Sequence, residues 1–241
     1  MRKFLIKICI IFIFICSLFI TNVYGFDKKI EAIDDSKDSK IIYLTFDDGP
    51  SCNTGSILNT LKTYDVKATF FLIGNQIQGQ EAIVKRIVNE GHSVGLHSYT
   101  HKTKSIYSNN ERFIDEMLKC QDEIYRVTGV KTNIIRFPCG SAKRLNSGFK
   151  EKLEYQGFKI YDWNIDSGDG IKPKTAPDRL FKRSIENKMG KNPVILLMHC
   201  DYCQKNTCKA LPKVIKFYKD KGYEFKVIDK STPEYYFPFK K

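Results

Sequence analysis

Short apolar runs rich in β-branched residues alternate with longer amphipathic stretches from residue 41 onward. An apolar run bounded by turn residues is typical of a buried strand, and apolar residues three or four apart predict a helix packed on one face. Seven strands are predicted, over 41–47, 68–74, 93–97, 133–138, 158–166, 193–199 and 223–229. Helices are predicted between them, over 54–64, 80–90, 110–128, 146–156, 177–189 and 207–221. This alternation favours an α/β fold with parallel strands, either a barrel or an open doubly wound sheet.

The N-terminal 25 residues have a different pattern. Three basic residues precede an apolar run at 8–20, and Val23-Tyr24-Gly25 fits a cleavage point. This arrangement is typical of a secretory signal peptide, with an uncleaved membrane anchor as the alternative. Residues 26–40 are almost all polar or charged and are predicted to be a linker. One folded domain is expected over 41–229, followed by a tail at 230–241.

The net charge of +13 arises from 40 Lys and Arg against 27 Asp and Glu. The first 25 residues contribute three basic side chains and no acidic one, so the remainder keeps +10. Such an excess favours an anionic partner. Outside the cell, acidic wall polymers or an anionic membrane surface fit better than nucleic acid, for which no motif is present. A lysine-rich composition that only aids solubility is the alternative.

Six of the eight cysteines follow the predicted signal peptide. Export permits disulfides, but six thiols are too few for a scaffold that depends on them. Three of them cluster in CDYCQKNTC, residues 200–208. A local disulfide between Cys203 and Cys208 is the favoured interpretation, ahead of free thiols, a redox pair or two metal ligands.

Unusual polar residues lie at or near the C-terminal ends of five predicted strands. They are Asp47-Asp48, His97, Arg136, Asp166 and His199. Active sites of parallel α/β folds are assembled at this edge of the sheet. The sequence therefore predicts that these side chains share one site.

The motifs TFDDGP and HSYTH suggest a metal centre. Asp47 and Asp48 can divide their work, one remaining ionised on a cation while the other takes a proton. His97 and His101 have the spacing that places two imidazoles on one face of a helical turn. Two histidines and one carboxylate form a three-ligand zinc site with an open position. Taken singly, a helix-capping Asp pair and ordinary surface histidines are the alternatives.

Three further motifs carry candidate catalytic groups. In RFPCGS, the Arg136 guanidinium can clamp a carboxylate, and the backbone N–H after Pro138 can donate to an oxyanion. His199 suits general-acid work near neutrality, and an acid within residues 161–169 can keep such an imidazole protonated. Two roles are open for Trp163: it is expected either to line a pocket or to pack in the core. A surface salt bridge for Arg136 and a solvated position for His199 are the simpler alternatives.

In this order the motifs TFDDGP, HSYTH, RFPCGS, YDWNIDSGD and LLMHC resemble the polysaccharide deacetylase family, also called carbohydrate esterase family 4. The resemblance spans about residues 41–229 and is strongest to exported Gram-positive peptidoglycan deacetylases. It implies a distorted (β/α) barrel that binds one divalent metal, usually zinc. A site of this kind also accepts cobalt, manganese or iron.

The resemblance also implies a role for the residues of the first three motifs. Asp48, His97 and His101 would be the metal ligands. Asp47 would be the general base, and Arg136 would orient it.

The later motif residues receive their roles from the same resemblance. His199 would be the general acid, tuned by Asp166. The backbone N–H of Cys139 would stabilise the oxyanion, while Trp163 and Leu197 would shape the acetyl pocket.

The implied reaction is removal of N-acetyl groups from a polysaccharide by attack of a metal-bound water, with release of acetate. N-acetylglucosamine of peptidoglycan is the favoured substrate, and the product amine would weaken binding by lysozyme-like hydrolases. The alternatives are an acetyl esterase or deacetylase acting on xylan or chitin oligomers, a non-catalytic wall-binding protein, and a thiol oxidoreductase.

The expected location is outside the cell, in the wall or on the outer face of the cytoplasmic membrane. Membrane attachment would come only through the N-terminal segment, if it is uncleaved. We expect a monomer. The aromatic tail, 230–241, is expected to pack on the domain rather than to touch glycan.

Overall fold

The computed structural model describes residues 39–172, 174–187 and 190–239. The predicted signal peptide, 1–25, and nearly all of the predicted linker, 26–40, lie outside the described residues. Within the described ranges, none of the helices combines the length and the apolar character needed to cross a membrane.

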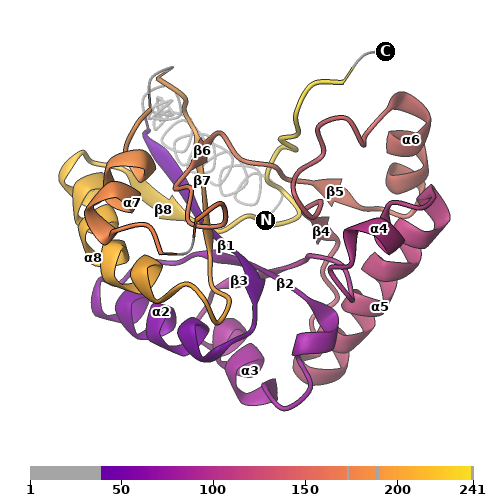
Figure 1. Ribbon diagram of the computed structural model, residues 1–241, viewed down its shortest axis with the longest axis horizontal. Coiled ribbons are helices and arrows are strands. Elements are labelled where there is room, and N and C mark those ends of the chain that lie inside the picture. Colours follow the sequence, from indigo (N-terminus) through magenta and orange to yellow (C-terminus); the bar gives the residue numbers. More distant parts are fainter. Residues whose placement is uncertain (1–38, 173, 188–189, 240–241) are drawn as a thin grey trace, which may run out of the picture. The chain divides into compact units, whose positions relative to one another are not determined.

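The described strands form one sheet in which every pairing is parallel (Figure 1). The sheet order is β5-β4-β3-β2-β1-β7-β6, and β8 also pairs with β1. The strand bounds are β1 Ile41–Gly49, β2 Thr69–Leu72, β3 Ser93–Leu96, β4 Ile134–Ile135, β5 Lys159–Ile160, β6 Ile165–Asp166, β7 Val194–His199 and β8 Glu224–Lys226.

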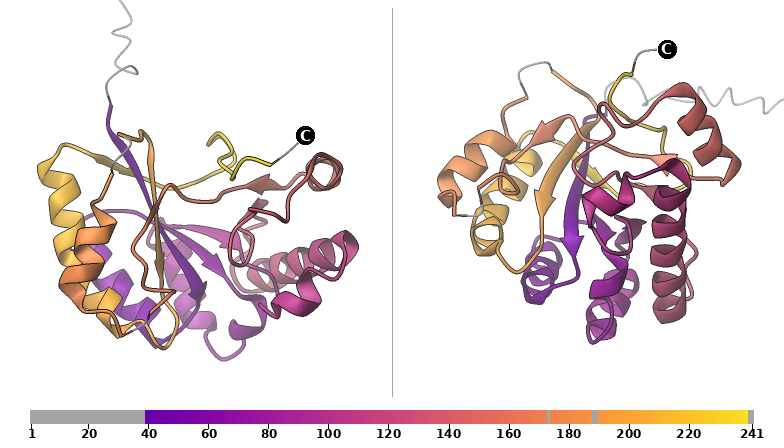
Figure 2. Two further views of the ribbon diagram at one scale, coloured as in Figure 1. Left: turned by 45° about the horizontal axis from the view of Figure 1, so that its top comes forward. Right: turned by 45° about the vertical axis from the view of Figure 1, so that its right-hand side comes forward.

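The central strand β1 changes partner along its length. Its first residues, Ile41–Tyr43, pair with β8, whereas Thr45–Gly49 pair with β2. On its other side β1 stays paired with β7. The strands curl into a half-barrel, which confirms the parallel α/β prediction and agrees with the distorted barrel rather than with an open sheet (Figure 2).

Helices follow most of the strands and lie on the outside of the curled sheet (Figures 1 and 2). Their bounds are α2 Cys52–Thr63, α3 Glu81–Asn89, α4 Thr103–Ile106, α5 Asn110–Thr128, α6 Ser147–Tyr155, α7 Pro177–Ser184 and α8 Lys205–Asp220. Local sequence explains where three of them begin. The side chains of Ser51, Asn109 and Asn146 accept hydrogen bonds from backbone N–H groups in the first turns of α2, α5 and α6.

The predicted strand over 158–166 is wrong in one respect, because the structure divides it into β5 and β6. These two strands lie at opposite ends of the sheet order. Between them the backbone N–H of Asp162 donates to Tyr235 O, and the Asp162 carboxylate binds Ser141 and the backbone of Phe237. A buried acid that needs polar partners thus interrupts a run that reads as one strand.

The ends of the strands bring the predicted site residues to one edge. Asp47 of β1 is directly paired with His199 of β7. His97 follows β3 and Arg136 follows β4, two strands that pair at Leu96 and Ile135. The fold therefore assembles the candidate site at the C-terminal edge of the sheet, as the sequence predicts.

Candidate active site

The two carboxylates of β1 point into the same pocket because the strand is irregular at its end. Consecutive residues of a regular strand face opposite sides of the sheet. Here the pairing of β1 with β2 shifts register between Asp47 and Gly49, and Asp48 adopts a left-handed φ of 65°. Both Asp47 and Asp48 line the pocket as a result.

The two histidines of HSYTH lie on a loop, so the predicted helical turn is wrong. Residues 97–101 have no helical assignment, and Ser98 and His101 have left-handed φ angles of 67° and 55°. The Ser98 hydroxyl accepts a hydrogen bond from the His101 N–H at 3.0 Å. This compact loop brings the two imidazoles to a centroid separation of 5.0 Å.

A buried glutamate from α5 holds this loop in place. Glu116 is 1% exposed. Its carboxylate accepts hydrogen bonds from the backbone N–H groups of Tyr99 and Thr100, at 3.1 and 2.7 Å, and from the Thr100 hydroxyl. Arg112, one turn earlier on α5, donates to the same carboxylate at 3.1 Å. Glu116 therefore anchors the backbone that carries both histidines.

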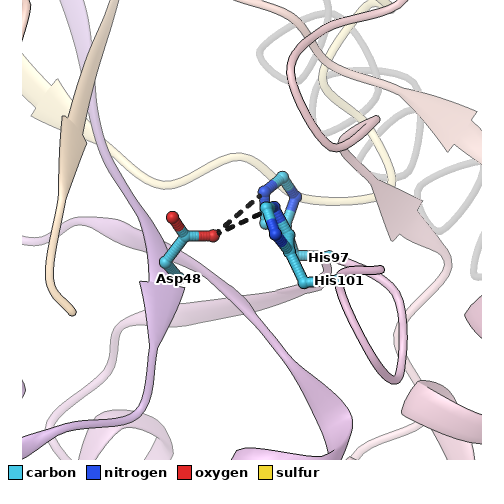
Figure 3. Close-up of side chains that lie close together, drawn as sticks. All are labelled: Asp48, His97 and His101. Atoms are coloured by element: carbon cyan, nitrogen blue, oxygen red, sulfur yellow. Dashed lines mark ion pairs between the residues drawn. The ribbon is translucent and has the colours of Figure 1, made fainter. Parts of the chain in front are cut away.

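Asp48, His97 and His101 form a cluster suited to a metal ion. Asp48 Oδ1 lies 3.4 Å from Nε2 of His97 and 3.3 Å from Nε2 of His101 (Figure 3). Ligand atoms of a tetrahedral zinc site, each about 2.0–2.2 Å from the ion, are about 3.3–3.5 Å apart. Asp48 Oδ1 is buried and has no hydrogen-bond donor among the described residues. The separations and the unpartnered oxygen both fit a bound cation.

The hydrogen bonding of His97 prepares it to be a ligand. Its Nδ1 lies 3.0 Å from the carbonyl oxygen of Arg136. A carbonyl only accepts, so Nδ1 carries the proton and Nε2 presents a lone pair to the cluster. Burial lowers the pKa of His97, which keeps the ring neutral, as metal ligation requires.

Arg136 is fully buried and makes four hydrogen bonds. Its Nη1 donates to Asp47 Oδ1 at 2.8 Å and to the Thr45 hydroxyl at 2.7 Å. Its Nε and Nη2 donate to the backbone oxygens of Tyr161 and Asp162. The predicted contact with Asp47 is present, but it involves one carboxylate oxygen rather than two.

The single contact leaves the second oxygen of Asp47 directed at the site. Oδ2 lies 3.7 Å from His97 Nε2. Asp47 is therefore held through Oδ1 and can accept a proton at Oδ2.

The partner of His199 is Asp169, which corrects the assignment of Asp166 to this role. His199 Nδ1 lies 2.8 Å from Asp169 Oδ1, and its backbone N–H donates to Asp169 Oδ2. Thr207 donates to the same oxygen. The Asp166 carboxylate instead accepts from the N–H of Gly168 and lines the pocket.

The pair of Asp169 and His199 favours the charged imidazolium. Burial opposes the charge, but the hydrogen bond and negative charge of Asp169, with the carboxylates of β1, raise the pKa of His199 to about 9. Although burial would raise it, the contacts with His199 lower the pKa of Asp169. Gly170 makes the packing possible, since a Cβ there would lie 2.4 Å from the His199 ring.

The pocket between these groups has a volume of about 360 Å³. It contains every predicted catalytic, metal and substrate-binding residue except the buried Arg136: Asp47, Asp48, His97, His101, Cys139, Trp163, Asp166, Leu197 and His199. Cys139 stands at the third position of a turn closed by the N–H of Gly140 bonded to Phe137 O at 2.8 Å. Its left-handed φ of 62°, as in a type II turn, is unusual for a residue with a side chain.

The predicted disulfide between Cys203 and Cys208 is absent from the described structure, where both are free thiols. Cys208 lies in the first turns of α8, and its Sγ is 3.8 Å from the backbone oxygen of Asn53 in α2. Cys203 is exposed in the preceding turn and lines the pocket. The Cys203 thiol is thus at the pocket surface, whereas the Cys208 thiol is partly buried against α2.

Two important residues were missed by sequence reasoning. Asp169 lies in the motif YDWNIDSGD, which offers three acids, and spacing alone does not show which of them reaches His199. Glu116 had a usable signal, because it lies beside Met117 and three residues after Phe113 on the apolar face of α5. An acid on a buried helix face requires a polar partner.

The pair of Asp169 and His199 predicts a titration in the metal-free protein. We expect an NMR midpoint near 9 for His199 in the wild type and a fall in Asp169→Asn, where only the more distant carboxylates of Asp47 and Asp48 still oppose the effect of burial. The pair's stabilisation is complete below the unfolded-state pKa of about 6.5 and is lost as pH rises through about 9. Asp166→Asn, the matched control, keeps the high midpoint. The reverse ranking of the two variants would contradict the assignment.

The contacts of Glu116 predict an effect on the metal site from a residue that is not a ligand. Glu116→Ala leaves the partly buried N–H groups of Tyr99 and Thr100 without their acceptor, so the free energy of unfolding should fall by about 1–3 kcal/mol. Loss of loop order should weaken zinc binding by about 10-fold or more. Urea unfolding and calorimetry measure the two effects. Glu123→Ala, which removes a surface pair with Arg126 on the same helix, is the control. Wild-type zinc affinity in Glu116→Ala would refute the anchoring role.

Comparisons with known proteins agree with this geometry. The family model for polysaccharide deacetylase matches residues 34–159. A peptidoglycan-N-acetylglucosamine deacetylase from Bacillus cereus is 41% identical over 192 residues, covering 78% of this chain and 69% of that relative.

Solved structures show the same similarity. A polysaccharide deacetylase from Bacillus cereus matches with a TM-score of 0.73 and 39% identity, over 78% of this chain and 92% of the other. The catalytic domain of a peptidoglycan N-acetylglucosamine deacetylase from Eubacterium rectale matches with a TM-score of 0.75 and 29% identity, over 85% and 96%. The chain thus belongs to the polysaccharide deacetylase family, carbohydrate esterase family 4, and is a hydrolytic enzyme of that family.

Proposed function

We propose that this enzyme removes N-acetyl groups from N-acetylglucosamine residues of peptidoglycan and releases acetate. The observation that carries the proposal is that one pocket contains the Asp48, His97 and His101 cluster together with Asp47 and His199. These are the groups that hydrolysis of an unreactive amide requires: a cation site, a base and an acid. The similarity to named peptidoglycan-N-acetylglucosamine deacetylases supports this choice of glycan.

The proposed cation is zinc, held by Asp48 Oδ1 and by Nε2 of His97 and His101. Cobalt, manganese or iron would suit the same ligands. When bound there, a divalent cation would polarise the acetyl carbonyl and lower the pKa of a bound water to about 7. The neutral ring of His97 can donate its Nε2 lone pair to the cation. The ring of His101 is partly exposed, so the site is open to the pocket on that side.

Asp47 is the proposed general base. Arg136 holds Oδ1 at 2.8 Å through a charge-assisted hydrogen bond. Oδ2 remains available on the pocket side to take the proton of the attacking water.

His199 is the proposed general acid, and Asp169 is the positioning residue behind it. An amine is a poor leaving group until its nitrogen is protonated, so the acid must carry its proton at neutral pH. The raised pKa of His199, about 9, meets this requirement. With Nδ1 bonded to Asp169, the ring directs Nε2 at the substrate nitrogen.

The remaining walls suit an acetyl group. Leu197 and Trp163 line the pocket and are the proposed apolar surface for the methyl group. Cys139 also lines the pocket, in a left-handed turn conformation, and its backbone N–H is the proposed oxyanion donor. A backbone donor at that position would stabilise the developing oxyanion without help from a side chain.

We also propose that the enzyme acts outside the cell, at the wall. The predicted signal or anchor, 1–25, and the net charge of +10 beyond it support export toward anionic wall polymers. The relatives named as peptidoglycan deacetylases act on a wall polymer, which supports the same location.

The proposal is tested by acetate release from purified peptidoglycan with residues 26–241. We expect release that is lost with a chelator and restored by zinc. Chitin oligomers and acetylated xylan are the comparison substrates. Release from xylan but not from peptidoglycan would contradict the proposed substrate, and chelator-resistant release would contradict the metal site.

His199→Ala separates an amidase from an esterase in the same assay. The alkoxide of an ester leaves without prior protonation more readily than the amine of an amide. Loss of the acid should therefore reduce amide hydrolysis by about 100-fold or more and spare ester hydrolysis. Equal losses on both substrates would contradict the role of His199 as the acid for the leaving amine.

A further inference from the structure

A second hollow adjoins the active-site pocket. Its volume is about 530 Å³, and its lining includes Trp163, Asp166, Lys191, Tyr235 and Phe237. Trp163 and Asp166 also line the active-site pocket. The two hollows therefore share a wall, and we call the second one the tail groove because the C-terminal tail contributes two of its aromatic side chains.

The tail runs as an additional extended segment beside β5. The N–H of Tyr235 donates to Ile160 O at 3.1 Å, and Tyr235 O accepts from the N–H of Asp162 at 2.6 Å. Further on, the N–H of Phe237 donates to the Asp162 carboxylate at 2.8 Å. These bonds to the region between β5 and β6 confirm that the tail packs on the domain.

The extended backbone divides the aromatic side chains of the tail between two sides. Successive side chains of an extended segment alternate in direction. Tyr235 and Phe237 line the tail groove. Tyr236 instead stacks on Phe239, with ring centroids 5.8 Å apart, and lies near Lys150 of α6.

Phe237 also fixes the indole that separates the two hollows. Its ring meets Trp163 edge to face at 5.1 Å. Gly140 permits this packing, since a Cβ there would lie 3.0 Å from both rings. Trp163 is only partly buried, so the indole is held in place while part of it remains accessible.

We propose that the tail groove is a second glycan subsite, which binds a neighbouring sugar of the strand whose acetylated residue occupies the active-site pocket. This inference rests on the proposed function. Half-buried aromatic rings offer flat apolar surface to a pyranose, and a few charged groups supply hydrogen bonds to its hydroxyls. Trp163, Tyr235 and Phe237 supply the rings, and Asp166 and Lys191 supply the polar groups.

The shared wall explains why a longer glycan would be preferred. A short oligomer fills the active-site pocket alone, whereas a longer one crosses Trp163 and Asp166 into the tail groove. Asp166 then acts as a specificity residue between the two hollows rather than as a partner of His199.

The single tryptophan of the chain makes the subsite measurable without catalysis. Titration of the metal-free protein with chitin di- and tetrasaccharides would be followed by Trp163 fluorescence. We expect the tetrasaccharide to bind about tenfold more tightly in the wild type, and Phe237→Ala to remove most of this difference. Tyr235→Ala, which keeps the backbone bonds of the tail, should act in the same direction. Tyr236→Ala is the matched control and should keep the wild-type difference.

The outcomes separate this inference from the proposed function. Equal affinities for the two oligomers in the wild type, or an unchanged difference in both Phe237→Ala and Tyr235→Ala, would overturn the subsite even if acetate is released from peptidoglycan. Absence of acetate release from every glycan would overturn the proposed function. A length-dependent affinity lost in the two groove variants but kept in Tyr236→Ala would still support the subsite.

Discussion

The buried guanidinium of Arg136 ties together the strand ends from which the active site is built. A charge without exposure to water costs several kcal/mol unless it is paired with an opposite charge and hydrogen-bonded. Arg136 meets this condition with the Asp47 carboxylate, the Thr45 hydroxyl and two backbone oxygens between β5 and β6. The need to satisfy this one charge therefore determines how β1, β4 and the segment after β5 approach one another.

Arg136 also gives two adjacent carboxylates different surroundings. Its side chain holds Oδ1 of Asp47, and its carbonyl oxygen sets the tautomer of His97. Asp48, displaced by the irregular end of β1, faces both imidazoles instead. The opposite wall carries a second pair of charges, in which Asp169 stabilises the protonated form of His199. The proposed base, the proposed cation site and the proposed acid thus line one pocket, each with its own supporting contacts.

The sequence predicted most of this arrangement, because parallel strands end in polar motifs that converge at one edge. Prediction from the sequence failed where tertiary contacts decide the local conformation or the partner of a side chain. The run 158–166 reads as one strand, but the partners of Asp162 break it in two. The loop between His97 and His101 has helical spacing, but Glu116 holds it in a different conformation. Asp169 was missed because three acids in one motif are equivalent until the fold shows which one lies behind His199.

The division of labour at the end of β1 is tested most directly by zinc content and acetate release in Asp47→Asn and Asp48→Asn. The two substitutions are isosteric and adjacent, but only Asp47→Asn removes the charge partner of the buried Arg136, so urea unfolding of both variants is the control for damage to the fold. We expect Asp48→Asn to lose stoichiometric zinc, and Asp47→Asn to keep it while acetate release falls by about 100-fold or more. Retention of zinc by Asp48→Asn, or equal loss of zinc from both variants, would contradict the account.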